Sequence, residues 1–353
     1  MKKFLIFGLA LLLVGAALFA DDAKVMPMRV GRFYLAPSFA FANKAFDEDG
    51  SRVDIQGDGS AKVFNLGAAL EYGILNWMTG ALQWAPGINV WSKIETTAFP
   101  FPNPDLRLFD VGDLFLGAKM QILGKDGLVK NDNVRLSFAP GIKIPLPGPD
   151  FEKQFENAGK GDPVTLATMD KHALAAGLRS YFDFIINDKF FINLYNESLF
   201  YVTKKDFEKA GFQEYATISG VNAAAGGLGS VEGKVKYGYD LTFELEPVFS
   251  TPIAQSVSFT AGLPVTYKTS PGAKYEFSGS GLAGSSLVTT METMFPDGDQ
   301  SHNLTLTPNA ALFFYGWPLP MEFKLSYTAP LWGQNIGYAQ NVIGFQIRVY
   351  FKI

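Results

Sequence analysis

The residues from Val111 to Leu123, VGDLFLGAKMQIL, alternate between two rows of side chains that differ in character. One row is apolar throughout and consists of Gly112, Leu114, Leu116, Ala118, Met120 and Ile122. The other row includes Asp113, Lys119 and Gln121. Because successive side chains of a β-strand point to opposite faces, this pattern predicts a strand with one apolar and one largely polar face. A chain built from such strands must place its apolar faces against either a protein core or lipid.

The same alternation recurs in about twelve segments and predicts an all-β fold, with ten to fourteen strands left open. The segments run approximately over 31–42, 62–74, 77–92, 109–122, 133–146, 173–187, 189–203, 232–249, 255–268, 303–315, 319–331 and 341–353. Most are about 11–15 residues long, whereas strands of soluble proteins centre on about 5–6 and a tilted strand needs about 9–11 to cross a bilayer. The lengths therefore favour membrane-spanning strands.

Charge placement and loop lengths agree with that interpretation. Asp, Glu, Lys and Arg make up 18% of the chain, yet the central parts of the apolar rows contain none of them, and charge facing lipid is costly. The connections also alternate in length, as in outer-membrane barrels with short periplasmic turns and long extracellular loops. The long loops are expected near 43–61, 93–108, 147–172, 204–231 and 269–302. We therefore predict a transmembrane antiparallel β-barrel of about twelve strands with both termini in the periplasm. A soluble β-sandwich or a barrel with a polar exterior is the alternative, since alternation alone does not say which face lies inside.

The start of the sequence indicates export. Lys2 and Lys3 precede an apolar run from Phe4 to Phe19, and the small residue Ala20 stands before two aspartates. This is typical of a secretory signal peptide, residues 1–20, and leaves residues 21–353 as a single barrel domain. An anchoring helix is the alternative, but the apolar run is short and acidic residues follow it directly.

Composition narrows the partners. Without Lys2 and Lys3 the 30 basic residues fall to 28, against 34 acidic ones, so the net charge becomes −6 and nothing suggests nucleic acid. We expect localisation in the bacterial outer membrane, with outer-membrane lipid, a small-molecule solute and, during biogenesis, the barrel assembly machinery as partners.

Catalytic and cofactor motifs are scarce. The chain has no cysteine, which excludes disulfides, thiolate metal sites and Cys nucleophiles. It also has no phosphate-binding loop, metal-ligand spacing or dinucleotide fingerprint, so we expect neither a cofactor nor a metal. His172 and His302 lie at the predicted extracellular rim near Asp170, Asp297 and Asp299, which leaves an Asp/His hydrolase as a remote candidate. No serine motif accompanies them, and we expect that the protein is not an enzyme.

Three stretches resemble a known family. LEYGILNWMTGALQWAPGINVW is similar to a hairpin of that family in which a Tyr-Gly-Ile strand end turns into an amphipathic strand. VGDLFLGAKMQIL is similar to its Gly-Asp-Leu-x-Leu-Gly-x-Lys strand, and APGIKIPLPGPD to the strand that follows. The family is that of outer-membrane transporters named after meta-pathway phenol degradation, FadL-like in style, and the resemblance covers roughly residues 64–150. It implies uptake of small, often hydrophobic compounds. The span from Asp21 to Val30 is too short for the N-terminal hatch that plugs FadL itself.

If the apolar rows face lipid, the other rows line the lumen with charge. The candidate lumen residues are Asp113, Lys119, Arg135, Lys143, Arg179, Asp183, Glu197, Asp240, Glu244, Glu246 and Arg348, and the predicted eighth strand adds Glu232, Lys234 and Lys236. Such charges either orient a passing solute or form ion pairs that fill the barrel. Glu244 and Glu246 predict a preference for cations if water reaches them, with Arg348 or Lys268 as candidate counter-charges.

Small inward residues of the first three strands indicate either free space or tight packing against an inserted loop. The Gly/Ser-rich loop 270–301 is a candidate for folding inward, and short helices are expected within 149–163 and 204–215. The predicted function is a porin-like channel or transporter for small solutes, with hydrophobic compounds among the candidates. A surface-exposed structural or adhesin-like protein with a filled barrel is the alternative.

Overall fold

The computed structural model describes residues 22–55, 59–95 and 106–353. The predicted signal peptide, residues 1–20, lies outside the described residues. Within the described ranges, every helix is too short or too polar to cross a membrane.

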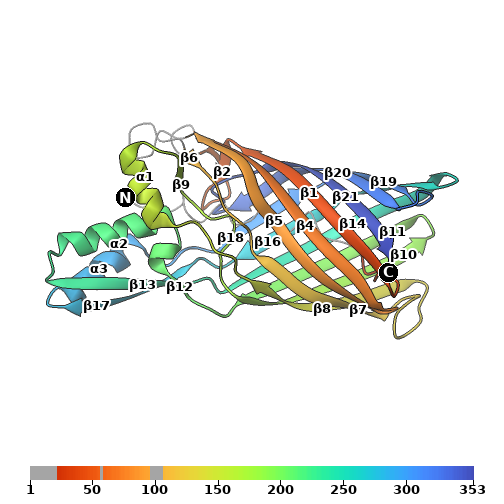
Figure 1. Ribbon diagram of the computed structural model, residues 1–353, viewed down its shortest axis with the longest axis horizontal. Helices are drawn as coiled ribbons and strands as arrows, with labels where there is room; N and C mark the ends of the chain where they lie inside the picture. Colours follow the sequence, from red (N-terminus) through yellow and green to blue (C-terminus); the bar gives the residue numbers. More distant parts are fainter. Residues whose placement is uncertain (1–21, 56–58, 96–105) are drawn as a thin grey trace.

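Twelve antiparallel strands close into one β-barrel (Figure 1), as the sequence predicts. Ten of them are single elements: β1 (Val30–Ala42), β4 (Ser60–Leu75), β5 (Met78–Glu95), β7 (Leu114–Leu123), β8 (Val134–Ile144), β10 (Ala175–Asn187), β11 (Phe190–Tyr201), β14 (Tyr239–Ala254), β20 (Met321–Gln334) and β21 (Asn341–Lys352). The other two are each split in two: β15 (Val257–Gly262) with β16 (Val265–Ser270), and β18 (Ser301–Leu306) with β19 (Asn309–Phe314). Pro264 and Pro308 stand at the two breaks, where a residue without a backbone N–H interrupts the ladder. The first and last strands close the barrel, with Val30 opposite Lys352 and Phe41 opposite Asn341.

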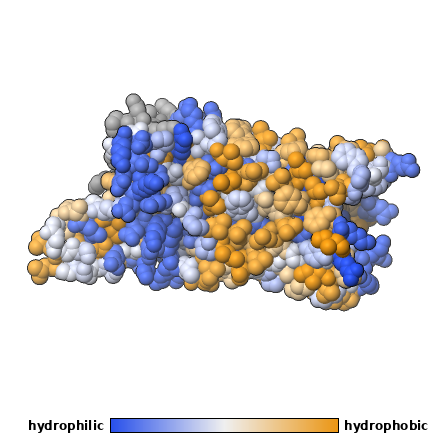
Figure 2. Space-filling view, in the orientation of Figure 1, coloured by the Kyte–Doolittle hydropathy of each residue, from blue (hydrophilic) through white to orange (hydrophobic). Residues whose placement is uncertain are grey.

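The apolar rows face outward. In VGDLFLGAKMQIL, Leu116 is 47% exposed on the outer surface, whereas Phe115 and Lys119 are buried inside. Leu82 on the adjacent strand β5 and Leu194 on β11 are similarly exposed. Figure 2 shows the result as an apolar belt on the visible face of the barrel, bordered at both ends by hydrophilic surface. A lipid-facing exterior accounts for this inversion of the usual soluble pattern.

The two ends of the barrel differ as predicted. Short turns join the strands at the end where β1 begins and β21 ends, which is the periplasmic end in barrels of this type. The long connections gather at the opposite, extracellular end (Figure 1). The first of them contains the hairpin of β2 (Lys44–Phe46) and β3 (Arg52–Asp54). The next two contribute the short strands β6 (Leu106–Arg107) and β9 (Val164–Thr165), which pair in parallel.

Helix α1 (Phe151–Lys160) forms within the predicted 149–163 segment. Asp150 caps its first turn by accepting a hydrogen bond from the Lys153 N–H, and Gly161 ends it in the left-handed conformation. The second predicted helical segment also contains helix, as the 3-10 turn η3 (Phe207–Lys209) and the start of α2 (Phe212–Ala224).

Two long connections combine into a small outer domain beyond the barrel. It consists of β12 (Lys205–Asp206), η3, α2, β13 (Gly229–Lys236), β17 (Lys274–Gly281) and α3 (Gly284–Met294). Phe207 is fully buried at its centre, where its ring meets Phe277 and Phe295 edge to face. In Figure 1 the paired strands β13 and β17 extend away from the barrel.

The outer domain corrects three predictions. The segment 232–249 is not one strand, because Gly238 turns the chain at φ +73° between β13 and β14. Residues 229–236 pair with 274–281 of the outer domain, so Glu232, Lys234 and Lys236 do not line the lumen. The predicted inward fold of 270–301 is wrong as well, since its apolar residues Met291 and Phe295 pack into the outer domain.

One wall strand is also shorter than predicted: the strand predicted from residue 109 begins only at Leu114.

Candidate functional site: the barrel lumen

A chain of polar contacts crosses the middle of the lumen. Arg32 on β1 pairs with Glu71 on β4, with Nη2 2.7 Å from Oε2. The Gln83 amide on β5 donates to the same carboxylate at 3.4 Å and accepts a hydrogen bond from Arg179 of β10. Since β7 and β8 separate β5 from β10 in the wall, the Arg179–Gln83 contact spans part of the lumen.

Arg179 is the centre of this network. Its Nε lies 2.5 Å from Glu197 Oε1 on β11, and its guanidinium stacks 3.7 Å from the centroid of the Phe115 ring. Lys119 takes a similar position 4.0 Å from the ring of Tyr181. Two largely buried cations over aromatic faces combine charge with apolar surface inside the barrel.

Two inward glycines, Gly117 on β7 and Gly141 on β8, make room for the Phe115 ring. A Cβ at Gly141 would lie 2.4 Å from Phe115 Cζ, and one at Gly117 would lie 2.8 Å from its Cε1. No side chain larger than hydrogen fits at either position without moving the ring. At these two positions, on β7 and β8, glycine serves tight packing against a side chain of the wall itself.

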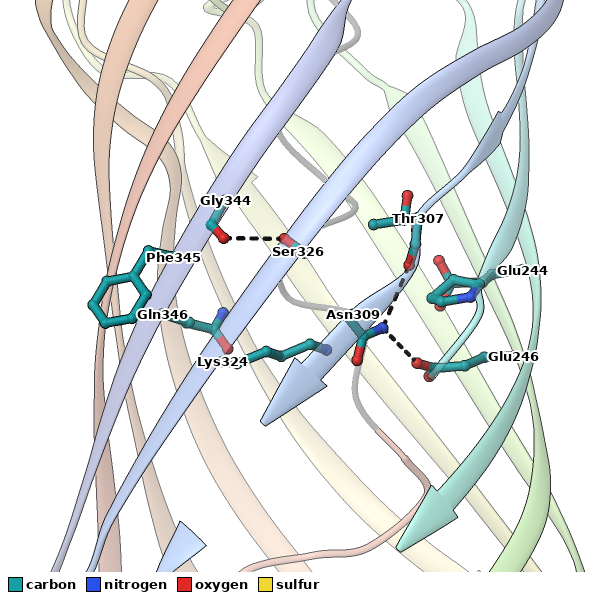
Figure 3. Close-up of a pocket in the computed structure, with 10 residues that line it drawn as sticks. Glu244, Glu246, Thr307, Asn309, Lys324, Ser326, Gly344, Phe345 and Gln346 are labelled. Carbon is teal, nitrogen blue, oxygen red and sulfur yellow. Dashed lines mark hydrogen bonds between the residues drawn. The ribbon is translucent and has the colours of Figure 1, made fainter. Parts of the chain in front are cut away.

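The acidic strand β14 borders a small cavity with room for about one water molecule, about 20 Å³ (Figure 3). Glu244 accepts a hydrogen bond from Thr266 Oγ1 at 2.8 Å, and Glu246 accepts one from Asn309 Nδ2 at 3.0 Å. Lys324 and Gln346 line the opposite side of the cavity. Arg348, a candidate counter-charge from the sequence, instead forms its ion pair with Glu322, Nη1 to Oε1 3.1 Å.

The segment before the first strand, residues 22–28, enters the periplasmic end of the lumen. Ala23 is completely buried, and its N–H donates to both oxygens of Asp183, at 3.2 and 3.1 Å. The Ala23 carbonyl accepts from Gln121 Nε2 at 3.0 Å and from Ser137 Oγ at 2.5 Å. Arg135 forms an ion pair with the same carboxylate, with its Nε 2.6 Å from Asp183 Oδ2. One alanine backbone thus has hydrogen-bond partners on three different strands.

Further along the segment the contacts continue to the wall. Lys119 Nζ donates to the carbonyl of Asp22 at 2.8 Å and to that of Lys24 at 3.3 Å, and the Met26 N–H donates to Thr79 Oγ1 at 2.7 Å. A second small cavity, about 20 Å³, separates the segment from the Arg179 network. The segment is therefore bound to the lumen mainly by polar side chains, as a peptide ligand would be. The sequence points to this role only in hindsight, through the inward-facing polar row it contacts.

The extracellular mouth contains a buried cluster of charge. His172 lies between two carboxylates, with Nε2 2.9 Å from Asp110 Oδ2 and Nδ1 3.0 Å from Asp113 Oδ1. Burial opposes a charge on the imidazole, but the two aspartates outweigh it and raise the pKa of His172 to about 9. Beside it Lys143 pairs with Asp170, 2.5 Å between Nζ and Oδ1.

The cluster attaches the 146–172 loop to the barrel wall. Lys171 Nζ lies 2.5 Å from Asp240 Oδ1 on β14, and the hydroxyl of Tyr201 donates to Asp240 Oδ2 at 2.7 Å. The Asp113 N–H donates to Asp170 Oδ2 at 3.1 Å. Burial lowers the pKa of Lys171 despite its acidic partner.

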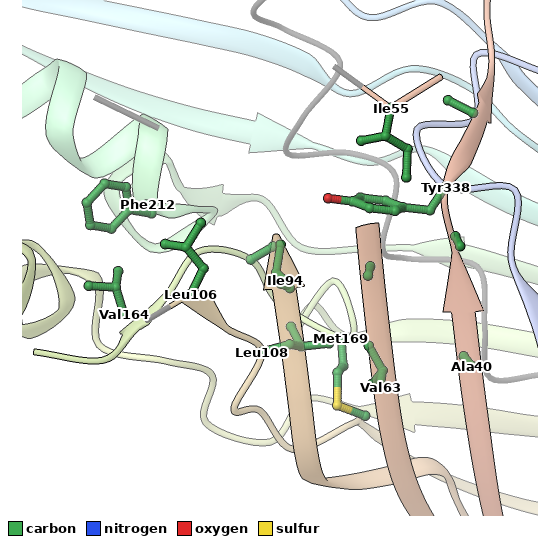
Figure 4. Packing of buried hydrophobic residues seen from close by; sticks show 14 of the residues in the cluster. Ala40, Ile55, Val63, Ile94, Leu106, Leu108, Val164, Met169, Phe212 and Tyr338 are labelled. Carbon is green, nitrogen blue, oxygen red and sulfur yellow. The ribbon is translucent and has the colours of Figure 1, made fainter. Parts of the chain in front are cut away.

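An apolar cluster covers the mouth next to this charge (Figure 4). Ala40, Val63 and Ile94 project from the ends of β1, β4 and β5, and loop residues including Leu108 and Val164 pack on them. The full set of labelled members is Ala40, Ile55, Val63, Ile94, Leu106, Leu108, Val164, Met169, Phe212 and Tyr338. In the described residues, the lumen is thus covered by loops at one end and by residues 22–28 at the other.

The sequence-predicted lumen residues fall into four groups. The N-terminal segment contacts Lys119, Arg135 and Asp183; the central network contains Arg179 and Glu197; the mouth cluster contains Asp113, Lys143 and Asp240; and the small cavity region contains Glu244, Glu246 and Arg348. The candidate lumen residues did not include Arg32, Glu71, Gln83 and Phe115, which are buried in the interior. The alternation itself places all four on inward rows, so it contained the signal.

The two histidines lie apart from each other in different surroundings. Both ring nitrogens of His172 face carboxylates, whereas His302 Nδ1 lies 2.7 Å from the Tyr267 hydroxyl, near the ring of Trp332. Asp297 accepts a hydrogen bond from the Tyr275 N–H of the outer domain. These contacts hold loops and strands together.

An apolar exterior around a closed barrel, with charge inside, defines the class: the chain has the fold of an outer-membrane β-barrel. No family model matches the sequence, and no curated protein matches it.

Solved structures do match. A crystal structure of an outer-membrane channel from Pseudomonas putida F1 is similar over 94% of this chain and 99% of that one, with a TM-score of 0.62 at 12% identity. The β domain of the Bordetella autotransporter BrkA (92% and 100% covered, 9% identity, TM-score 0.41) and the monoaromatic hydrocarbon channel CymD (93% and 89%, 8% identity, TM-score 0.36) are more distant. The first of these likenesses supports the fold.

Proposed function

We propose that this protein is an outer-membrane channel for small solutes, and that residues 22–28 close its lumen in this conformation. The observation behind the proposal is that a segment that is not part of the barrel wall occupies the periplasmic end of the lumen. Ala23 is held by hydrogen bonds from and to side chains of three strands. A barrel whose only task is structural has no need of a separate peptide inside its periplasmic end.

The contacts of the segment suit reversible release. They are hydrogen bonds and ion pairs between polar groups, which water can replace when the segment leaves. Withdrawal would expose the inward Thr79, Lys119 and Asp183 to solvent and open a path toward the Arg179 network. The wall strands can stay in register throughout, because residues 22–28 take no part in strand pairing, and the backbone bonds of β1 to its neighbours begin at Arg29, whose N–H donates to the Gly73 carbonyl.

We infer that the solutes are small and at least partly hydrophobic. Phe115, Tyr181 and Tyr195 supply aromatic surface inside the lumen, and Arg179 and Lys119 lie over two of these rings. A ring or short apolar chain that carries one polar group would find both kinds of contact there. The resemblance of residues 64–150 to the phenol-degradation transporters supports the same solute class.

A reversible lock tests the closing role of the segment. The chain has no cysteine, so Ala23→Cys with Ser137→Cys gives one possible disulfide between segment and wall. We expect oxidised protein in planar bilayers or swelling liposomes to pass little current or solute. Reduction should then raise the flux several-fold, because the segment regains its freedom to leave.

The cysteine-free parent is the matched control, and its flux should not respond to the reductant. Equal flux through oxidised and reduced double variant, with the disulfide verified, would contradict a closing role. No flux in any state, including a variant shortened before Val30, would overturn the channel proposal itself.

The outer domain favours a second candidate function. It has its own apolar core and stands beyond the barrel, which is the arrangement expected of an adhesin-like surface protein with a filled lumen. Such a protein would pass no solute after release of the segment, so the same flux measurement separates the two.

A further inference from the structure

The far end of the outer domain contains no charged residues. Its outer tip lies within residues 217–231, from the later part of α2 into β13, and residues 277–291, from β17 into α3. Neither stretch contains Asp, Glu, Lys, Arg or His. The base of the same domain is rich in charge, with ion pairs between Lys204 and Glu276 and between Lys209 and Asp206.

Two leucines project from the outer tip. Leu282 is 93% exposed and Leu228 is 62% exposed, far more than a folded domain requires of its large apolar side chains. They are neighbours, since Gly229 pairs with Gly281 and the Ala283 N–H donates to the Leu228 carbonyl at 3.1 Å. In Figure 2 this end of the molecule is largely apolar or neutral, and a hydrophilic zone separates it from the apolar belt of the barrel.

The backbone of the outer tip has internal hydrogen-bond partners. The N–H of Gly226 donates to the Ala223 carbonyl at 3.1 Å, and that of Leu228 to the Ala225 carbonyl at 3.0 Å. Gly226 and Gly227 have φ of +58° and +84°, which allows this tight turn. Backbone groups already satisfied within the chain lose little on leaving water.

Several polar side chains of the outer tip are satisfied internally too. Asn222 bonds both the carbonyl and the N–H of Val231, at 3.0 and 2.8 Å. In α3, the hydroxyls of Thr289 and Thr290 donate to carbonyls one turn earlier, those of Ser285 and Ser286. Hydroxyls that bond back to their own helix are the arrangement that apolar surroundings favour.

We propose that the outer tip docks on an electrically neutral lipid surface outside the cell by inserting Leu228 and Leu282. Without charge the tip has no electrostatic attraction to an anionic partner and no charged group to desolvate. Protein interfaces are rich in Trp, Tyr and Arg around a flat or concave patch, whereas the tip has none of these three and presents two projecting leucines. The acyl chains of a lipid layer, unlike a flat protein surface, can surround a projecting side chain on all sides. The cell's own bilayer lies at the far side of the charged base, so the lipid belongs to another membrane or vesicle.

A fluorescent label tests insertion directly. The cysteine-free full-length protein, held in nanodiscs, takes an environment-sensitive dye at Leu282→Cys or, as a control site at the charged base, at Lys209→Cys. Phosphatidylcholine vesicles should shift the emission of the dye at position 282 to the blue and leave the dye at position 209 unchanged. An unchanged spectrum at position 282 would overturn the proposal.

Flotation of the nanodisc-held protein with the same vesicles gives the second measurement. Leu228→Ser with Leu282→Ser should lower the floated fraction at least about tenfold, because two leucines no longer leave water. Leu319→Ser, which alters an exposed leucine in a periplasmic turn, should have no effect. Binding that survives the double substitution, or that requires anionic lipid, would contradict the proposal. Pairing of nanodiscs through the tips without vesicles would assign the leucines to a second copy of the chain instead.

Discussion

At the scale of single residues, His172 combines burial with two acidic partners. Asp110 and Asp113 raise its pKa from the ordinary 6.5 to about 9, which favours the charged imidazolium in the folded protein. The stabilisation is therefore complete below about pH 6.5 and is lost as the pH rises through about 9, with a contribution on the order of 3 kcal/mol. We expect the ring protons of His172 to titrate in NMR spectra with a midpoint near 9.

The chain has two histidines, so His302→Gln leaves one signal and fixes the assignment. Asp110→Asn should lower the midpoint, because one of the two carboxylates loses its charge. A midpoint near 6.5 in the parent protein would show that solvent reaches the imidazole and that the mouth cluster is open, and one well below 6.5 would contradict the two ion pairs.

Glu244 and Glu246 give a second prediction at this scale. Both carboxylates face the lumen beside the small cavity, where Thr266 and Asn309 are their hydrogen-bond donors. If the open channel admits water there, the pair should favour cations, and Glu244→Gln with Glu246→Gln should lower that preference. Reversal potentials under a salt gradient measure it. An unchanged preference in a conducting double variant would leave the two residues with a structural role.

At the scale of elements, the outer domain depends on the Phe207 ring. This side chain is fully buried against Phe277 and Phe295, so Phe207→Ala should cost the outer domain about 3–5 kcal/mol. We expect limited proteolysis to cut within 204–236 and 270–300 much faster in this variant. The barrel should keep its faster migration on unheated gels, because its strands pair independently of β13 and β17. Phe109→Ala, at a 63% exposed ring, is the matched control and should leave the cleavage pattern unchanged.

Local sequence pattern determines which elements can be predicted. Each wall strand shows its own two-row alternation, so the twelve strands follow from the sequence. The outward direction of residues such as Leu116 follows from strand length, the absence of charge on the apolar rows and the alternating loop lengths. Strand β13 has the same alternation but pairs with β17, some forty residues later in the chain, and only that tertiary partner removes Glu232 from the lumen. Residues 22–28 have no periodic pattern. Contacts with Asp183 and Gln121, far away in the sequence, determine their conformation, so the sequence alone does not predict it.

Partner choice inside the lumen is only partly predictable. Alternation places Arg179 and Glu197 on inward rows, and their adjacent strands make the pair foreseeable. The contact between Arg179 and Gln83 depends on the curvature of the closed barrel and on the small side chains between them.

At the scale of the whole molecule, the lipid-facing surface should tolerate charge poorly. Leu116 lies on the outer face of the wall between Leu82 and Ile142. Leu116→Arg should lower the free energy of unfolding in lipid vesicles by about 2–4 kcal/mol, since the bilayer core does not solvate the guanidinium. Leu128→Arg, at an exposed leucine in a periplasmic turn, should change it by less than about 0.5 kcal/mol. Urea titration followed by heat-modifiable migration measures both, and equal effects would argue that Leu116 meets water.

The seam between β1 and β21 has a consequence for biogenesis. The two strands that close the wall come from opposite ends of the described chain, with Gly31 opposite Phe351. Until β21 arrives, the growing sheet has two unpaired edges whose N–H and C=O groups would find no partner among acyl chains. A nascent chain that still lacks its last strand therefore has no stable way to sit in a bilayer, so membrane entry and ring closure have to coincide in time.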